Sequence, residues 1–203
     1  NDNVAISKLF GYTLDEIYEN IVYDQDAYSI TSFPGMREKT IILNGFSKTY
    51  AMTGWRIGYG VMPKEIAVHI AKLVTNSTSC LAGFTQMAAI EALTGDQGEV
   101  KRRVEQFRIR RDRIVEGLNE IPGIKCLKPA GTFYVFPNVK QFGMSSSKIA
   151  DYLLYEAGVA TLGGNSFGIY GEGYLRLSYA NSLDNIEIAL ERIKKALNKL
   201  KRL

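Results

Sequence analysis

The sequence predicts an α/β fold, because short apolar segments typical of strands alternate with longer segments that have helical periodicity. The clearest strand is Lys39 to Leu43, which is short, β-branched and apolar. A second strand is predicted from Arg56 to Val61, where glycines punctuate the segment. Open α/β sheets place their ligands beyond the carboxyl ends of their strands, so the residues after Leu43 are expected to form part of a site.

Five helices are predicted from apolar residues that recur every three or four positions, together with signals at the helix ends. Ser145 and Ser182 are suited to cap helices at their amino ends, and Gly95 and Gly158 are suited to end them. The predicted helices are one with Pro63 in its first turn, then Phe84 to Leu93, Glu99 to Ile121, Lys148 to Ala157 and Ile186 to Leu200.

The second half of the chain is predicted to form a smaller α+β region, reached through the long helix that starts near Glu99. Pro129 to Pro137 has the pattern of a turn followed by a strand. Two further strands, near Val159 to Leu162 and Tyr174 to Tyr179, flank the glycine-rich segment Gly163 to Gly168. We predict that this segment is a mobile loop that closes over a ligand.

The composition agrees with a soluble globular protein, and the sequence predicts no membrane segment and no metal site. Hydrophobic residues make up 46% of the 203 residues, and charged residues make up 23%. No stretch approaches the roughly 20 consecutive apolar residues that a membrane-spanning helix needs. Cys80 and Cys126 lack the spacing of a metal or redox motif, which favours a reducing, cytoplasmic compartment. The lone histidine, His69, is interpreted as structural.

The net charge of +4 is unevenly distributed, so nucleic-acid binding has to be considered. Basic residues gather in Lys101 to Arg113 and in Arg192 to Arg202. Apolar residues within both stretches recur at helical spacing, so most of the charge is expected on the solvated faces of amphipathic helices. We therefore predict no nucleic-acid partner. The buried line of the first helix is expected to contain Val104, Phe107, Arg111, Ile114, Leu118 and Ile121.

Residues suited to one kind of chemistry gather around the predicted strand that ends at Leu43. Lys48 and Arg56 are eight residues apart in a glycine-flanked stretch. Lys48 is suited to act as a reactive amine, and the planar guanidinium of Arg56 is suited to bind a phosphate. Upstream, Asp15 and Tyr18 are three residues apart. At this spacing a carboxylate and a phenol can converge on one ligand.

Taken one at a time, these residues also have ordinary interpretations. Asp15 suits a turn or a helix cap, Tyr18 suits the edge of a core, and Lys48 suits a solvated surface. Arg176, which lies in an alternating strand after a glycine-rich lead-in, suits an exposed sheet edge. It is their combination and spacing that favour a functional site.

The motifs resemble those of the class I/II aminotransferases, which are fold-type I pyridoxal-phosphate enzymes. The family pattern of Asp-Glu-x-Tyr, Ser-Lys and Gly-x-Arg is matched by Asp15 to Tyr18, Ser47-Lys48 and Gly54 to Arg56. The segment Gly171 to Ala180 is similar to the family's segment with a carboxylate-binding arginine. The resemblance spans roughly residues 11 to 203.

The resemblance implies an architecture and a cofactor. Residues 1–98 would form the carboxyl-terminal part of a large domain with a mostly parallel sheet. Residues 99–203 would form a linking helix and a small α+β domain. The implied cofactor is pyridoxal 5′-phosphate, and a homodimer is implied as well. Relatives have a long amino-terminal half that is not in this sequence, so the chain is expected to be the carboxyl-terminal half of the enzyme.

Roles for the cofactor site are carried over from the family residue by residue. Lys48 would hold the cofactor's aldehyde as a Schiff base and move the proton between substrate and cofactor. Asp15 would pair with the ring nitrogen, and Tyr18 would donate to the ring's phenolic oxygen. Arg56 would clamp the phosphate, with Ser47 beside it.

Two further positions complete the comparison with the family. Arg176 would bind the α-carboxylate of the substrate through its fork of donors. Gly45 is a departure, since many relatives carry a hydroxyl residue three positions before the lysine. The part that Ser47 takes in holding the phosphate therefore stays open.

The implied activity is transfer of the amino group of an L-amino acid, of the aspartate or aromatic class, to a 2-oxo acid such as 2-oxoglutarate. The amino acid and the oxo acid are thus the expected partners. The same scaffold also supports C–S or β-lyases that use the same lysine. Outside enzymes, the alternative is a non-catalytic fragment that binds a ligand.

Overall fold

The computed structural model describes residues 11–200 and divides the chain into two compact units, Asn1–Arg102 and Arg103–Leu203. The division falls within helix α4 (Gly98–Asn119), close to the domain boundary predicted at residues 98 and 99. The assignment of these units to a large and a small domain stays a prediction. Arg202, at the end of the predicted second basic stretch, lies outside the described residues.

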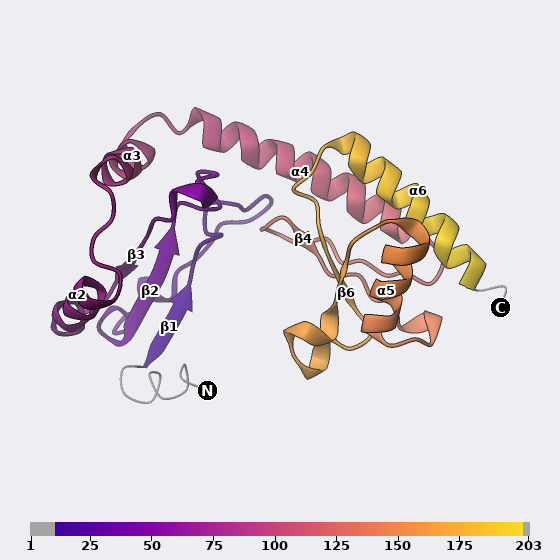
Figure 1. Cartoon of the computed structure of the whole chain (residues 1–203), viewed down its shortest axis with the longest axis horizontal. Helices are drawn as coiled ribbons and strands as arrows, with labels where there is room; N and C mark the ends of the chain where they lie inside the picture. Colours follow the sequence, from indigo (N-terminus) through magenta and orange to yellow (C-terminus); the bar gives the residue numbers. More distant parts are fainter. Residues whose placement is uncertain (1–10, 201–203) are drawn as a thin grey trace. The chain divides into compact units, whose positions relative to one another are not determined.

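The first unit contains a three-stranded sheet in the order β1 (Tyr12–Asp15), β2 (Thr40–Gly45) and β3 (Gly58–Val61), as Figure 1 shows. β1 is parallel to β2, whereas β3 is antiparallel to it. The described sheet is therefore mixed. Because β1 and β2 run in the same direction, their carboxyl ends lie at one edge of the sheet, and the antiparallel β3 begins at that edge.

Helices α2 (Lys64–Ser77) and α3 (Gly83–Thr94) complete the first unit. Pro63 immediately precedes α2, where its fixed backbone angle suits a helix start, and Gly95 ends α3 as predicted. None of the residues of α2 is buried. Large apolar side chains remain exposed on both helices, which is unusual for a complete globular domain. They include Val68, Leu73, Val74, Phe84, Met87 and Ile90.

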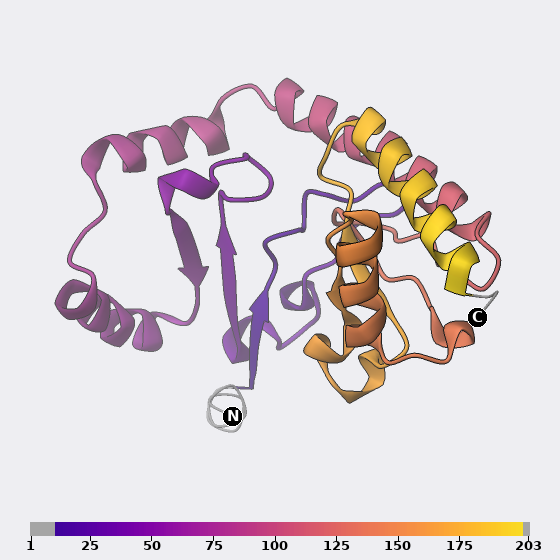
Figure 2. The same ribbon diagram turned by 45° about the vertical axis from the view of Figure 1, so that its right-hand side comes forward.

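The second unit has antiparallel strands in the order β4 (Tyr134–Val135), β6 (Leu175–Ser178) and β5 (Leu162–Gly163). Helices α5 (Ser146–Ala157) and α6 (Leu183–Leu200) lie side by side, as Figure 2 shows. These strands and helices, with the carboxyl-terminal part of α4, enclose the main hydrophobic core. Its members include Ile114, Leu118, Ile149, Leu153, Leu175, Ile193 and Leu197.

The buried line predicted along α4 includes one arginine, and the structure confirms that Arg111 is fully buried. Its Nε donates to Asp112 Oδ1 at 2.8 Å and its Nη1 donates to the Pro129 carbonyl at 3.1 Å. Burial alone would raise the pKa of Asp112. Hydrogen bonds from Lys128 and Arg111 outweigh burial and lower this pKa, so the buried guanidinium faces an ionised carboxylate.

Neither a membrane-spanning helix nor a cluster of metal ligands is present among the described residues. No helix within residues 11–200 is long and apolar enough to cross a membrane. Over the same part of the chain, no group of three or more histidine, cysteine, aspartate or glutamate side chains is arranged to hold a metal ion.

Cys126 gives a prediction for alkaline pH. Its side chain is buried in the core of the second unit, and burial raises the pKa of its thiol to about 11. An unfolded cysteine ionises near pH 8.5. The unfolded state therefore loses its proton first, and this thiol's contribution to folding stability is lost as pH rises from about 8.5 through 11.

We expect alkylation of Cys126 to report this shift in a Cys80→Ser variant, which removes the exposed second thiol. In the folded protein, the alkylation rate should stay low through pH 9 and rise only near pH 11. In denaturant the same thiol should titrate near pH 8.5. A native titration midpoint close to the denatured value would contradict the burial argument.

Candidate active site

Lys48 lies on a short loop that follows the carboxyl end of β2, as predicted. The loop closes on the carbonyl of Phe46, which accepts hydrogen bonds from the amides of Tyr50, at 3.3 Å, and Met52, at 3.2 Å. Phe46 and Met52 are both buried and belong to the small core of the first unit. The half-buried Lys48 is thus carried by a loop whose two ends are anchored.

Asp15 and Tyr18 lie at the same edge of the sheet as this loop. Asp15 is the last residue of β1 and is in register with Leu43 of β2. Its Oδ1 accepts a hydrogen bond from the amide of Ile17 at 3.2 Å, which fixes the turn toward Tyr18. Both side chains line a cavity of about 340 Å³, together with Glu16, Glu19, Asn20, Ala27, Tyr28 and Ser29.

A glutamate that the sequence analysis missed ties this turn to the end of β2. Asn44 Nδ2 donates to Glu19 Oε1 at 2.6 Å, and Asn44 Oδ1 accepts from the Gly45 amide at 2.7 Å. Burial raises the pKa of both Tyr50 and Tyr59, and the negative charge of Glu19 adds to the rise. Glu19 therefore holds the turn that follows Asp15 beside the end of β2, which leads to Lys48. Its negative charge also favours the neutral form of the Tyr50 and Tyr59 phenols.

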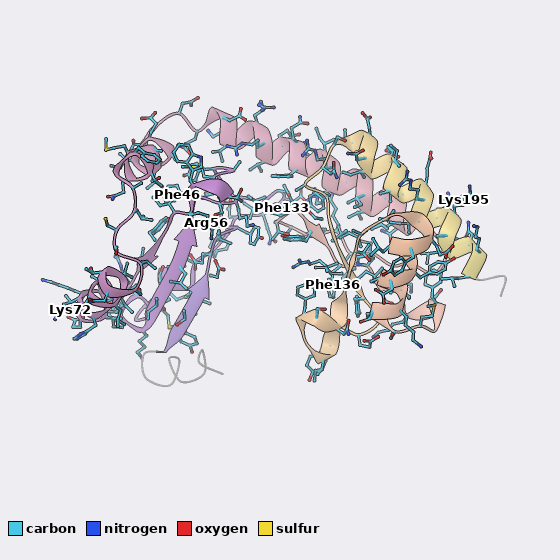
Figure 3. All side chains as sticks on the ribbon, in the orientation of Figure 1. Phe46, Arg56, Lys72, Phe133, Phe136 and Lys195 are labelled. Atoms are coloured by element: carbon cyan, nitrogen blue, oxygen red, sulfur yellow. The ribbon has the colours of Figure 1, made fainter. Side chains whose placement is uncertain are left out.

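Arg56 ends a short 3₁₀ helix, Thr53–Trp55, in the left-handed backbone conformation with φ of 52°. Its exposed side chain donates from Nη1 to the Thr53 carbonyl at 3.1 Å. The sequence analysis expected a strand to begin at Arg56, but β3 begins at Gly58. The left-handed turn explains the difference, because extended backbone cannot continue through it. Figure 3 shows Arg56 and Phe46 at the same end of the sheet.

The local structure explains why position 45 is a glycine. Gly45 faces Gly58 across the β2 and β3 pair. A Cβ atom at Gly45 would lie 3.3 Å from Gly58 Cα and 3.3 Å from the Ile57 carbonyl oxygen, closer than most Cβ contacts. The narrow approach of these two strands thus favours glycine where many relatives carry a hydroxyl residue. Ser47 is half-buried, and its role at a phosphate stays a prediction.

Arg176 lies on β6 in the second unit, between two core residues, Leu175 and Leu177, that point to the opposite face. The central carbon of its guanidinium is 4.5 Å from the centroid of the Tyr134 ring and 4.2 Å from that of Phe167. Neither ring was predicted as part of a site. The first unit thus holds Asp15, Tyr18, Ser47, Lys48 and Arg56 at one sheet edge, and the second unit holds Arg176.

A larger cavity of the first unit lies elsewhere. It has a volume of about 690 Å³ and is lined by residues that include Thr40, at the start of β2, and Val61, at the end of β3. It therefore opens at the opposite edge of the sheet from Lys48, and none of the predicted site residues lines it. Open α/β sheets bind their ligands at the carboxyl ends of parallel strands, which favours the edge with Asp15 and Lys48.

Comparison with known proteins identifies the family. Residues 12–193 match the family described as aminotransferase class I and II. The chain is 40% identical over 190 residues to the aspartate aminotransferase of Pyrococcus abyssi, covering 92% of this chain and 49% of that protein. It is also 40% identical over 190 residues to aromatic-amino-acid aminotransferase 2 of Thermococcus litoralis, with the same two shares.

A solved structure agrees with the sequence matches. The crystal structure of the aromatic aminotransferase from Pyrococcus horikoshii superposes with a TM-score of 0.91 at 38% identity, covering all of this chain and 56% of that one. The chain belongs to the class I and II aminotransferase family, has the fold of the fold-type I enzymes, and the family's aspartate and aromatic aminotransferases depend on pyridoxal 5′-phosphate. It spans about half the length of the curated relatives it matches.

Proposed function

We propose that this chain supplies the carboxyl-terminal half of a pyridoxal-phosphate aminotransferase. The enzyme moves the amino group of an L-amino acid, of the aspartate or aromatic class, to a 2-oxo acid such as 2-oxoglutarate. The observation that carries this proposal is the placement of Asp15 and the Lys48 loop at one edge of a sheet, within a chain that belongs to the aminotransferase family.

The residues at this edge fit the cofactor chemically. When bound, pyridoxal phosphate supplies an aldehyde that joins amines covalently and a ring that delocalises negative charge. The carboxylate of Asp15 suits a protonated ring nitrogen, and the phenol of Tyr18 suits the ring's phenolic oxygen. The guanidinium of Arg56 suits the phosphate, because its planar fork matches phosphate oxygens, and Ser47 offers a hydroxyl nearby.

Lys48 has two tasks in this proposal. Its Nζ would hold the cofactor through the aldehyde. As a free amine, the same Nζ would hold and move the proton at the α-carbon of the substrate. The anchored loop would serve both tasks, because its hydrogen-bonded ends limit the positions that the amine can take.

Binding of the substrate is proposed for Arg176. A guanidinium binds a carboxylate through two parallel N–H donors and so orients the α-carbon as well as holding it. The proposed assembly is a cytoplasmic homodimer in which polypeptide corresponding to the amino-terminal half of the relatives completes each subunit. The exposed apolar side chains of α2 and α3 support a need for this additional polypeptide.

Absorbance of the assembled holoenzyme tests the function. The band of the bound cofactor should shift when an L-amino acid is added and return when 2-oxoglutarate is added, with a new amino acid as the product. Release of pyruvate and ammonia would instead indicate a β-lyase. A ligand-binding fragment without catalysis would show no return of the band. Comparison of aspartate with phenylalanine as amino donors would then define the substrate class.

A further inference from the structure

The guanidinium of Arg176 is held between two aromatic rings. Both ring centroids, of Tyr134 and Phe167, are within 4.5 Å of its central carbon. Tyr134 lies on β4 and Phe167 ends the 3₁₀ helix Gly164–Phe167, so the two rings reach the cation from different segments of the unit. A guanidinium is planar and carries its five N–H donors in that plane. A ring that packs on the face of a guanidinium leaves the edge with the N–H donors available to a ligand.

Among the described residues, none uses the donors of Arg176. No hydrogen bond or ion pair joins this side chain to another residue in the range 11–200. Arg113, in the same unit, behaves differently, since its Nη2 donates to Glu187 Oε2 at 2.6 Å. The guanidinium of Arg176 is thus held by two aromatic rings while its N–H donors bind no described residue. This arrangement suits bidentate binding of a carboxylate.

Phe167 is the more exposed of the two rings. It is 48% exposed and ends a short 3₁₀ helix, Gly164–Phe167, rather than a strand of the core. The backbone beneath it is tightly fixed, because the Gly164 amide donates to the Tyr174 carbonyl at 2.8 Å. The Phe136 and Phe167 rings meet in a T-shaped arrangement, with centroids 6.2 Å apart and planes at 80°. This support keeps Phe167 over Arg176 although much of its surface is exposed.

We propose that Phe167 is a positioning residue for the carboxylate-binding arginine. It holds the guanidinium of Arg176 against Tyr134, so that the N–H edge faces the α-carboxylate of the substrate before the substrate arrives. This inference rests on the proposed function. A fork fixed in advance loses less conformational freedom when the substrate binds, so Phe167 acts on affinity for the carboxylate and not on proton transfer at the α-carbon.

Substitution of Phe167 by leucine in the holoenzyme tests this role, because leucine keeps apolar bulk but removes the aromatic face. We expect KM for the amino acid, and the dissociation constant of 2-oxoglutarate measured by calorimetry, to rise by about tenfold. The value of kcat should stay within about threefold, because the proton-transfer residues are untouched. KM for an amine of the same side chain that lacks the carboxylate should not change.

Two matched variants complete the test. Phe167→Tyr keeps the aromatic face and should keep the wild-type affinity. Tyr170→Leu alters a 90% exposed ring three residues further along the chain and should have no effect. Unchanged affinity in Phe167→Leu, or equal losses for the amino acid and the amine, would overturn the inference. If the wild-type protein binds 2-oxoglutarate but does not turn over, the proposed function fails, and the difference in affinity still decides the role of Phe167. Absence of binding to the wild-type protein would overturn both.

Discussion

Replacement of Lys48 by alanine is expected to lower the rate of transamination by at least about 10⁴-fold, because one amine performs both the covalent and the proton-transfer steps. The fold should survive, since the bonds that close the loop run between main-chain atoms of Phe46, Tyr50 and Met52. The measurement is the single-turnover rate of the holoenzyme, together with the absorbance band of the bound cofactor. That band should no longer show covalent attachment to the protein.

Two control variants separate the reactive amine from simple positive charge. Lys48→Arg keeps the charge, but its guanidinium stays protonated and cannot replace the amine, so it should be as inactive as alanine. Lys72→Ala removes an exposed lysine of α2, labelled in Figure 3, and should keep wild-type rates. A rate in Lys48→Ala above about one tenth of the wild-type rate would exclude Lys48 as the catalytic amine.

Local signals in the sequence predicted the local structure well. Ser145 caps α5, where its hydroxyl accepts from the Lys148 amide at 3.4 Å, and Gly158 ends that helix with φ of 62°. Both outcomes depend on residues only a few positions apart, so the sequence contains all the necessary information. The lysine after β2 was predictable for the same reason, because a strand signal and the loop that follows it are contiguous.

Contacts between distant segments could not be predicted in this way. The bond between Glu19 and Asn44 joins residues 25 positions apart, and it forms only because β1 and β2 pair in parallel. The rings on Arg176 come from β4 and from the 3₁₀ helix after β5, and no spacing in the sequence indicates that they converge. The start of β3 was placed two residues early because the left-handed backbone at Arg56 has no side-chain signal of its own.

Substitution of Arg176 by leucine is the second large effect that we expect. KM for the amino acid should rise by about 10²- to 10³-fold, since loss of a charge-assisted carboxylate pair in a desolvated site costs about 3 to 4 kcal/mol of binding. Arg176→Lys should recover only part of this loss, because an ammonium is a point charge without the planar fork. The cofactor should remain bound in both variants, since Arg176 is proposed to contact the substrate and not the cofactor.

Arg110→Leu is the matched control, because Arg110 also lies over a ring, with its guanidinium carbon 5.7 Å from the Phe107 centroid. No role in binding is proposed for it, so KM should not change. The deciding comparison is between the amino acid and its decarboxylated amine. Only the amino acid can use the guanidinium fork, so Arg176→Leu should abolish the preference for the carboxylate. If the variant weakened both substrates equally, the arginine would serve the fold of the second unit instead of substrate recognition.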